Sequence, residues 1–325
     1  MSKPEILIPD PLPPLAMEGI SKAFKTHYLW EKNDRQAFLE EVKSKIRGIA
    51  CGHPTVMDTA FIDVFPDLEI IGSLGVGYDS IDAVHAASRG IIVTNTPDVL
   101  SDEVADTAIG LMIMTARELS AAERWLRDGK WVNAPYPLTR GTLRKKKLGI
   151  LGLGRIGKAI ASRAAAMGME IHYHNRSRQP DVPYAYCSSL EDLATRCDVL
   201  MAVAPGGPAT HHIVNADIFR ALGPEGIFIN VGRGSVVDET ALIAALQNKT
   251  IMSAGLDVFE NEPHVPQALI DLDQVVLLPH VASASVDTRN AMAQLQVDNL
   301  IQWFSSGAPI SPVAETPWPQ PSSDS

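Results

Sequence analysis

The segment LGILGLGRIGKAIASRAAAMG, residues 148–168, constrains the fold more than any other part of the chain. An apolar run leads into Gly152-x-Gly154-x-x-Gly157, and a helix-period segment follows and ends near Gly168. The glycine spacing alone is short and recurs by chance. Between a strand and a helix, however, it predicts a tight turn that admits a pyrophosphate at the helix N-terminus. We expect a dinucleotide-binding unit here, and the alternative is a βα turn without a ligand.

Short apolar runs alternate with helix-period segments along the chain, which is typical of α/β domains with parallel sheets. At 325 residues, the length suggests about two domains. The strands predicted in the first third are Glu5–Ile8, Gly48–Cys51, Glu69–Ser73 and Ile91–Thr94. A second series comprises Leu148–Leu151, Glu170–Asn175, Val199–Val203, Ile227–Val231, Ser253–Val258 and Val275–Leu278. Six strands with intervening helices match a full dinucleotide-binding sheet.

Three predicted helices set the domain organisation, at Ile81–Arg89, at residues 101–131 and at Asp287–Phe304. The second begins with Ser101 as its expected N-cap and is apolar on more than one side, which favours burial between domains or subunits. The third returns the chain to the first domain. We therefore predict two Rossmann-like, doubly wound domains. Residues 1–99 plus 288–325 form a discontinuous, flavodoxin-like substrate domain, and residues 100–287 form an inserted cofactor domain with a dimerisation helix at 101–131.

The composition excludes several classes of function. A net charge of −10 argues against nucleic acid or an anionic membrane as a partner. No signal-peptide core is seen, and the longest apolar stretch, around Ala108–Ala116, is too short to span a membrane. Three scattered cysteines favour reduced thiols in a cytoplasmic protein, with neither disulfides nor a metal site. The last dozen residues, rich in Pro and Ser, are expected to be mobile.

The residues after the second strand of the glycine-rich unit indicate which dinucleotide is bound. Asn175 stands where an acidic residue would bind the ribose 2′-hydroxyl of NAD, and Arg176, Ser177 and Arg178 follow it. Two guanidinium groups and a hydroxyl suit a 2′-phosphate in charge and geometry. The pattern predicts NADPH as cofactor, with NADH weaker. The alternative is a solvated basic loop.

Three later segments each place a polar side chain just beyond an apolar strand, where ligands bind in open α/β sheets. NVGRGSVVDE (230–239) supplies Arg233, GLDVFENEP (255–263) supplies Glu262, and LLPHVASAS (278–285) supplies His280. Each residue alone can be explained without a function, as a surface arginine, a loop glutamate or a histidine after proline. Together they form a recognisable set.

That set, with GSLGVGYDSID (72–82), TNTPDVLSDEVADTAIGL (94–111) and LGLGRIG (151–157), resembles the D-isomer-specific 2-hydroxyacid dehydrogenases. The segments stand in the same order over nearly the whole chain. Within the family the chain is most similar to NADPH-dependent glyoxylate and hydroxypyruvate reductases, including members that reduce hydroxyphenylpyruvate. The resemblance implies reduction of small 2-oxo acids to 2-hydroxy acids, with the D configuration where the product is chiral, as in D-glycerate. The apolar helix at 101–131 predicts a homodimer.

The resemblance also implies roles that the side-chain chemistry supports. Arg233 would grip the substrate carboxylate bidentately and polarise the adjacent carbonyl. His280 would donate a proton to the carbonyl oxygen as hydride arrives. Glu262 would favour the charged form of His280 and orient its ring. The family's glycine-rich substrate loop maps to Leu74, Gly75, Val76 and Gly77, whose backbone N–H groups would hold the carboxylate.

Further positions are carried over from the family. The implied cofactor contacts, besides the three glycines and residues 175–178, are Thr107, Leu153, Arg155, Ile156, Ala204, Pro205, Val231, Gly232, Asp257, His280 and Ala282. The implied substrate contacts, besides the loop, Arg233 and His280, are Ser283 and Trp131, the latter reaching the neighbouring subunit's pocket. Asp257 as a loop cap and Trp131 as core packing are the alternatives. Ala282 departs from the glycine of many relatives.

Two rival functions remain open. A phosphoglycerate-oxidising relative would carry an acidic residue for NAD and basic groups for its substrate phosphate, but residues 73–78 contain no basic residue. A formate dehydrogenase is disfavoured, because its relay uses glutamine where this chain has Glu262. The second rival is a dinucleotide-sensing binding protein similar to the C-terminal-binding corepressors, which share the scaffold and the catalytic trio. Fold analogy does not separate it from an enzyme.

Overall fold

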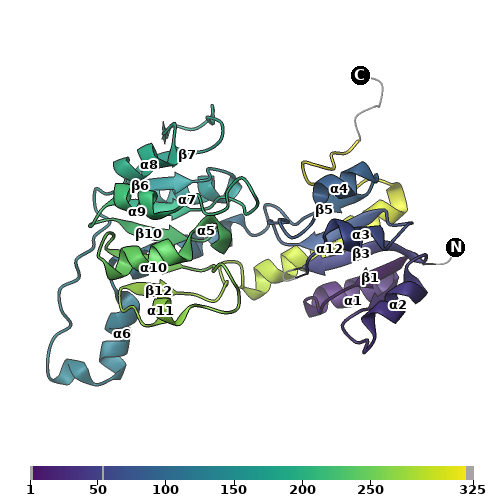
Figure 1. Cartoon of the computed structure of the whole chain (residues 1–325), viewed down its shortest axis with the longest axis horizontal. Helices are drawn as coiled ribbons and strands as arrows, with labels where there is room; N and C mark the ends of the chain where they lie inside the picture. Colours follow the sequence, from purple (N-terminus) through teal and green to yellow (C-terminus); the bar gives the residue numbers. More distant parts are fainter. Residues whose placement is uncertain (1–2, 53–54, 320–325) are drawn as a thin grey trace. The chain divides into compact units, whose positions relative to one another are not determined.

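The computed structural model describes residues 3–52 and 55–319. The chain folds into two compact units (Figure 1). Unit 1 comprises Met1–Leu100 and Ser285–Ser325, and unit 2 comprises Ser101–Ala284. The second unit is therefore inserted into the chain of the first.

Unit 1 contains a parallel sheet of five strands in the order β2-β1-β3-β4-β5. This is the 2-1-3-4-5 order of flavodoxin-like folds. Its elements are β1 (Glu5–Ile8), α1 (Pro14–Ala23), β2 (Lys25–Tyr28), α2 (Arg35–Val42), β3 (Ile46–Gly52), α3 (Thr59–Asp63), β4 (Ile70–Leu74), α4 (Ala83–Ser88), β5 (Ile92–Thr94) and α12 (Val286–Ser306).

Helices cover both faces of this sheet, because side chains alternate along each strand. Ile6 and Ile8 of β1 face α1 and α12, whereas Leu7 faces the layer that contains α2, α3 and α4. Gly72 of β4 allows α12 to approach closely, since a Cβ there would meet the Leu300 side chain at 3.3 Å. The C-terminal helix is thus built into the core of unit 1.

Unit 2 contains a parallel sheet of seven strands in the order β12-β11-β10-β9-β6-β7-β8. It is the 3-2-1-4-5-6 order of dinucleotide-binding folds with one more strand at the edge. Its strands are β6 (Lys147–Leu151), β7 (Glu170–His174), β8 (Ala185–Tyr186), β9 (Val199–Ala202), β10 (Ile227–Asn230), β11 (Ser253–Leu256) and β12 (Val275–Leu277). Its helices are α5 (Ser101–Ala116), α6 (Leu119–Arg127), η1 (Lys130–Val132), α7 (Arg155–Ala166), α8 (Leu190–Arg196), α9 (Ala216–Leu222), η2 (Gly234–Val236), α10 (Glu239–Gln247) and α11 (Gln267–Ile270).

Two apolar layers enclose the second sheet. Ile150 and Tyr173 pack against α5 and α7 on one face, while Leu151 and Phe228 pack against α8, α9 and α10 on the other. The predicted fold class of two doubly wound parallel sheets is confirmed. The sequence analysis missed β2 and β8, because KTHY is polar and only partly buried and β8 has only two residues.

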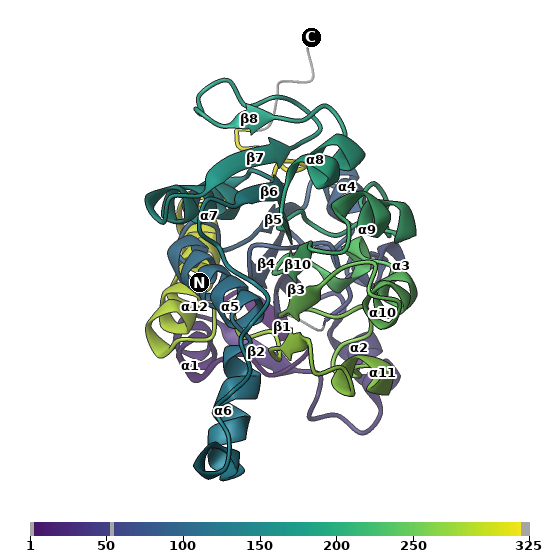
Figure 2. The same ribbon diagram turned by 90° about the vertical axis from the view of Figure 1, so that its left-hand side faces the viewer.

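The prediction of a single helix over residues 101–131 is wrong, because the first helix ends at Ala116 and a second begins at Leu119. Glu118 has a φ of 53°, in the left-handed region that interrupts a right-handed helix. The expected N-cap bond of Ser101 is also not made: its hydroxyl oxygen is buried and, among the described residues, has no hydrogen-bond partner. Figure 2 shows α6 projecting from the body of unit 2. No residue of α6 is buried.

The described part of the C-terminal tail makes two contacts with the rest of unit 1. Thr316 is 2% exposed, and its hydroxyl donates to the Val93 carbonyl oxygen over 3.1 Å. The Trp318 ring lies edge-on to Trp303, with their centroids 5.4 Å apart. Mobility of the last dozen residues stays a prediction, and residues 320–325 lie outside the described part.

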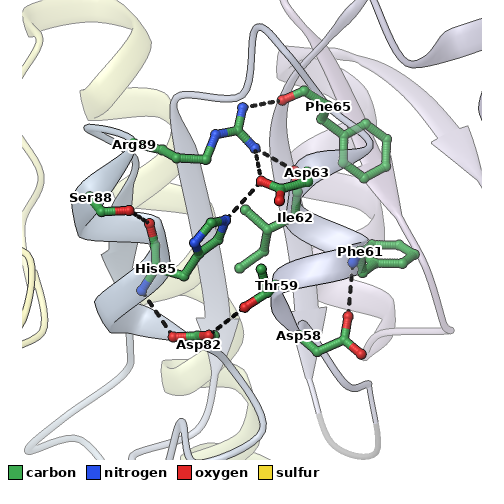
Figure 3. A network of polar contacts seen from close by, with 10 residues as sticks. All are labelled: Asp58, Thr59, Phe61, Ile62, Asp63, Phe65, Asp82, His85, Ser88 and Arg89. Carbon is green, nitrogen blue, oxygen red and sulfur yellow. Dashed lines mark hydrogen bonds and ion pairs between the residues drawn. The ribbon is translucent and has the colours of Figure 1, made fainter.

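Polar contacts join α3 and α4 on the surface of unit 1 (Figure 3). The Asp63 carboxylate contacts His85 Nε2 at 2.7 Å and Arg89 Nη1 at 3.2 Å. Arg89 also donates to the carbonyl oxygens of Ile62 and Phe65. The hydrogen bond to His85 lowers the pKa of the Asp63 carboxyl, with smaller contributions from the charges of His85 and Arg89. In the described part of the chain, no helix has the length and apolarity needed to cross a membrane.

Candidate active site

The glycine-rich turn connects β6 to α7 as the sequence predicts. Gly152 has a φ of 99°, and a Cβ there would lie 2.8 Å from the backbone nitrogen of Ala204. A Cβ on Gly157 would lie 2.3 Å from the Gly152 carbonyl oxygen, so both positions require glycine. At Gly154, by contrast, a Cβ would meet nothing within 4 Å.

Gly154 is also the N-cap of α7 and offers no side-chain hydrogen bond to the first helical N–H groups. These groups are the usual partners of an anion at a helix N-terminus. Arg155 is exposed beside them, whereas Leu153 is buried and Ile156 is partly buried. The turn therefore has the open backbone surface and the donors that a pyrophosphate needs.

Asn175 follows β7 and joins the strand to the glycine-rich turn. Its Oδ1 accepts a hydrogen bond from the Leu153 backbone N–H over 2.6 Å. Arg176, Ser177 and Arg178 are exposed beyond it. Within residues 3–52 and 55–319, no hydrogen bond or ion pair is recorded for either guanidinium. Both positive charges are therefore available to an anionic ligand.

The next strands add backbone and charge at the same edge of the sheet. Ala204 is buried and Pro205 exposed after β9, and Val231 and Gly232 are buried after β10. Arg233 follows, partly buried, and its Nη1 donates to the Gly232 carbonyl oxygen over 2.9 Å. The Asn230 side chain shapes this loop by accepting from Gly232 N and donating to the Arg233 carbonyl oxygen, each over 3.0 Å.

Glu262 and His280, predicted as an acid–base pair, are in contact. Glu262 Oε2 lies 2.7 Å from His280 Nδ1, and Glu262 Oε1 accepts from the Phe259 backbone N–H over 3.0 Å. The Glu262 side chain is 17% exposed and that of His280 is 36% exposed. The carboxylate is thus held by its own loop and contacts the imidazole at Nδ1. Because the two ring nitrogens are distinct, this contact assigns Nε2 to the substrate in the predicted acid–base role.

Asp257 holds the backbone on which His280 stands. Its carboxylate accepts from Val281 N over 2.8 Å and from Ala282 N over 2.9 Å. Its carbonyl oxygen accepts from His280 N over 2.8 Å. Burial raises the pKa of the Asp257 carboxyl, while the two backbone N–H groups act in the opposite direction. Asp257 is fully buried and caps this loop, which is the alternative that the sequence left open.

His280 itself has a φ of 53°. Residues other than glycine rarely adopt this left-handed conformation, and it is common at functional sites. Thr107 of α5 donates to the Ala282 carbonyl oxygen over 3.2 Å, so it supports the same turn from the helix side. Ser283, further along the turn, is partly buried.

Trp131, predicted to contact substrate in a neighbouring subunit, lies in η1. Its side chain is 65% exposed, which excludes the alternative of core packing within this chain. Val132 and Leu138 nearby are 89% and 98% exposed. This part of unit 2 therefore presents apolar surface that the chain does not cover by itself.

The predicted substrate loop, Leu74–Gly77, follows β4 in unit 1. All four residues are partly buried, and Gly75 has a φ of 145°. The Gly75 N–H donates to Thr96 Oγ1 over 3.0 Å, so it is already engaged. Among the described residues, no acceptor is recorded for the N–H groups of Val76 and Gly77. These two are the donors that the loop can offer to a carboxylate.

The sequence analysis missed the residues that hold this loop. Asn95 Nδ2 donates to the Val76 carbonyl oxygen over 2.8 Å, and Thr96 N donates to the Gly75 carbonyl oxygen over 2.8 Å. Ser311 Oγ donates in turn to the Asn95 carbonyl oxygen over 2.7 Å and accepts from buried Asn299 over 2.9 Å. The sequence feature that could have indicated these residues is the polar pair Asn95 and Thr96, directly after β5.

Comparison with known proteins agrees with this arrangement. Residues 109–282 match the family described as D-isomer specific 2-hydroxyacid dehydrogenase, NAD binding domain. A glyoxylate/hydroxypyruvate reductase of Arabidopsis thaliana is 43% identical over 308 residues, 95% of this chain and 98% of that protein. A hydroxyphenylpyruvate reductase of Plectranthus scutellarioides is 41% identical over 308 residues, with the same coverage of 95% and 98%.

Among solved structures, an NADPH-dependent glyoxylate/hydroxypyruvate reductase of Sinorhizobium meliloti, in complex with NADP and malonate, matches with a TM-score of 0.93. It is 50% identical, and the match covers 97% of this chain and 98% of that one. The matched family region and the full-length relatives confirm the resemblance inferred from the sequence motifs. The chain belongs to the D-isomer specific 2-hydroxyacid dehydrogenase family.

Proposed function

We propose that the protein reduces small 2-oxo acids, such as glyoxylate and hydroxypyruvate, to 2-hydroxy acids with NADPH. The observation that carries the proposal is the Glu262–His280 contact of 2.7 Å, in the same unit as a glycine-rich turn suited to a pyrophosphate. The names of the relatives support the same reaction. The products are glycolate and D-glycerate.

In this proposal Arg233 and His280 act on the substrate. The Arg233 guanidinium binds the carboxylate and polarises the neighbouring carbonyl. When bound, NADPH would supply the hydride. His280 Nε2 would donate a proton to the carbonyl oxygen, and Glu262 would hold the ring in orientation through Nδ1. Hydride and proton together convert the carbonyl into a hydroxyl group.

We assign cofactor binding to unit 2. The turn at Gly152–Gly157 would hold the pyrophosphate, and Arg176, Ser177 and Arg178 would bind the 2′-phosphate, which gives NADPH an advantage over NADH. Asn175 positions the turn rather than reading the ribose in the way an acidic residue does, because its side-chain oxygen is already bonded to Leu153 N. Ala204, Pro205, Val231 and Gly232 would line the nucleotide with backbone atoms.

We assign substrate recognition to the loop of unit 1, through the N–H groups of Val76 and Gly77. Ser283, in unit 2, is also assigned to substrate binding. The assignment of unit 1 as the substrate domain follows from this loop, since small backbone donors suit a carboxylate.

We further propose a homodimer in the cytoplasm. The exposed apolar side chains of Trp131, Val132 and Leu138 support a partner surface around α6 and η1. The three free, buried cysteines fit a reducing compartment. Light scattering at micromolar concentration tests the dimer, and a monomer there would contradict it.

The decisive assay mixes purified protein, NADPH and glyoxylate and follows the nicotinamide absorbance. Hydroxypyruvate and hydroxyphenylpyruvate are tested in parallel, the latter because of the relative that carries its name. The matching aldehydes without a carboxylate serve as controls and should turn over poorly. Binding of NADPH without turnover of any 2-oxo acid would favour a dinucleotide-sensing protein instead.

A further inference from the structure

Two consecutive histidines and a glutamate meet on the surface of unit 2, outside the residues assigned to the reductase. His211 and His212 lie between β9 and α9, and Glu260 lies in the loop after β11. One ring nitrogen of each histidine and one carboxylate oxygen of Glu260 all lie within 4.8 Å of one another. His212 Nε2 and Glu260 Oε1 are 2.5 Å apart.

The backbone brings the two imidazoles together. Consecutive side chains of an extended chain point to opposite sides, but His212 has a φ of 52°, in the left-handed region. The two rings consequently stack, with centroids 3.8 Å apart and planes inclined by 22°. The His212 N–H donates to the Ser235 carbonyl oxygen over 2.8 Å, which fixes this turn. The two rings therefore face the same side of the chain.

Negative charge gathers beside the two rings. The Glu260 N–H donates to Glu239 Oε1 over 2.8 Å, so a second carboxylate adjoins the loop. A divalent cation bound by Glu260 would offset part of the negative charge of these two carboxylates.

The His85–Asp63 pair in Figure 3 provides a contrast. There the carboxylate contacts one histidine and also Arg89, whose guanidinium already supplies a positive charge. Glu260, in the described part of the chain, forms an ion pair with His212 and with no Lys or Arg. The cluster thus combines two imidazoles with a carboxylate whose charge no fixed cation neutralises.

We propose that His211, His212 and Glu260 bind one divalent first-row transition metal ion, with Zn²⁺ as the best match. Two imidazole nitrogens and one carboxylate oxygen are preferred Zn²⁺ ligands, and water completes a tetrahedral set. Mg²⁺ and Ca²⁺ prefer oxygen ligands and fit the cluster poorly. Metal binding would replace the direct contact between His212 Nε2 and Glu260 Oε1. No metal site was expected from the sequence, because only the cysteines were considered as ligands.

The test is a calorimetric titration of the full-length, EDTA-treated protein with Zn²⁺. The variants are His211→Gln, Glu260→Gln and His212→Asn, since asparagine tolerates the left-handed backbone. Each should weaken Zn²⁺ binding at least about ten-fold, the lower end of the losses seen when metal sites are perturbed. The matched control His85→Gln removes another carboxylate-paired histidine and should bind Zn²⁺ as the wild type does.

A spectroscopic measurement makes the result independent of variant folding. Cu²⁺ added to the wild-type protein should give an electron paramagnetic resonance spectrum with coupling to two imidazole nitrogens. The spectrum should persist in His280→Asn, which distinguishes the cluster from the catalytic histidine. Zn²⁺ affinities unchanged in all three cluster variants, or a Cu²⁺ spectrum that is lost in His280→Asn, would overturn the proposal.

Discussion

Glu262 Oε2 lies 2.7 Å from His280 Nδ1, although 18 residues separate the two side chains in the sequence. The carboxylate is anchored from its other oxygen by the Phe259 N–H, and the His280 backbone is anchored by Asp257. Both partners are therefore positioned by separate backbone contacts. An imidazole held in this way has one defined orientation, which is what a proton donor requires.

Replacing His280 with asparagine should lower kcat for glyoxylate reduction by roughly 10²–10⁴, the usual contribution of a positioned proton donor. Asparagine suits the φ of 53° and so preserves the turn. The affinity for NADPH, measured by fluorescence titration, should barely change. A comparable loss of NADPH affinity would indicate a structural role.

Glu262→Ala should lower kcat for glyoxylate reduction, because the His280 ring loses the contact that fixes its orientation. Glu262→Gln should recover part of this activity, since its amide oxygen can still accept a hydrogen bond from His280 Nδ1. The measurement is kcat and KM for glyoxylate at saturating NADPH. An unchanged kcat in Glu262→Ala would show that Glu262 does not act through His280.

Arg176→Ala and Arg178→Ala should each weaken NADPH binding by roughly ten- to a hundred-fold, because a charge-assisted bond contributes about 1.5–3 kcal/mol. NADH lacks the 2′-phosphate, so its affinity should change little. The double variant need not show the product of the two effects, since both side chains can share one phosphate.

The control for these two variants is Arg196→Ala, which removes an exposed arginine of the same unit that pairs with Asp192. It should leave the preference between cofactors unchanged. Adding Asn175→Asp to the double variant should reduce NADPH use further, because a carboxylate there repels phosphate. Equal losses with NADH and NADPH would mean that the arginines only support the loop.

Asn95→Ala and Thr96→Val should raise KM for glyoxylate while leaving NADPH affinity unchanged, because both residues hold the 74–77 loop. A neutral hydrogen bond contributes about 0.5–1.5 kcal/mol, which corresponds to an increase of roughly two- to ten-fold. Thr59→Val, which removes a hydroxyl that bonds to Asp82 instead, is the matched control. An unchanged KM would show that Asn95 and Thr96 do not position the 74–77 loop for substrate binding.

Asp63→Asn should lower the unfolding temperature at neutral pH but not in acid. The pKa of this carboxyl is lowered in the folded state from its ordinary value of 3.8, mainly by the hydrogen bond to His85. Its contribution to stability is therefore present above the unfolded pKa and is lost as the pH falls through the folded one. Thermal unfolding of wild type and variant across this range checks the sign, with exposed Asp67→Asn as the control. A difference that persists once the carboxyl is protonated in both the folded and the unfolded state would contradict the linkage.

The sequence by itself determined the features that depend on local physics. Strand and helix periodicity gave the alternating architecture, and the glycines at 152 and 157 marked a turn that no side chain fits. Arg233, Glu262 and His280 were singled out because each follows an apolar strand, where a parallel sheet aligns the carboxyl ends of its strands. Their predicted roles came from the resemblance of the three segments to those of the family.

Only the tertiary structure decided the features that depend on partners distant in sequence or on a single backbone angle. The helix predicted at 101–131 ends early because the backbone of Glu118 is in the left-handed region. The spacing of apolar residues does not reveal a single backbone angle. Asn95, just after β5, donates to Val76, just after β4, and Ser311 of the C-terminal segment donates to Asn95. His211 and His212 face Glu260 only because one φ is positive and a loop some fifty residues away returns to them. Such contacts arise from how whole elements pack, and no local pattern of residue types encodes that packing.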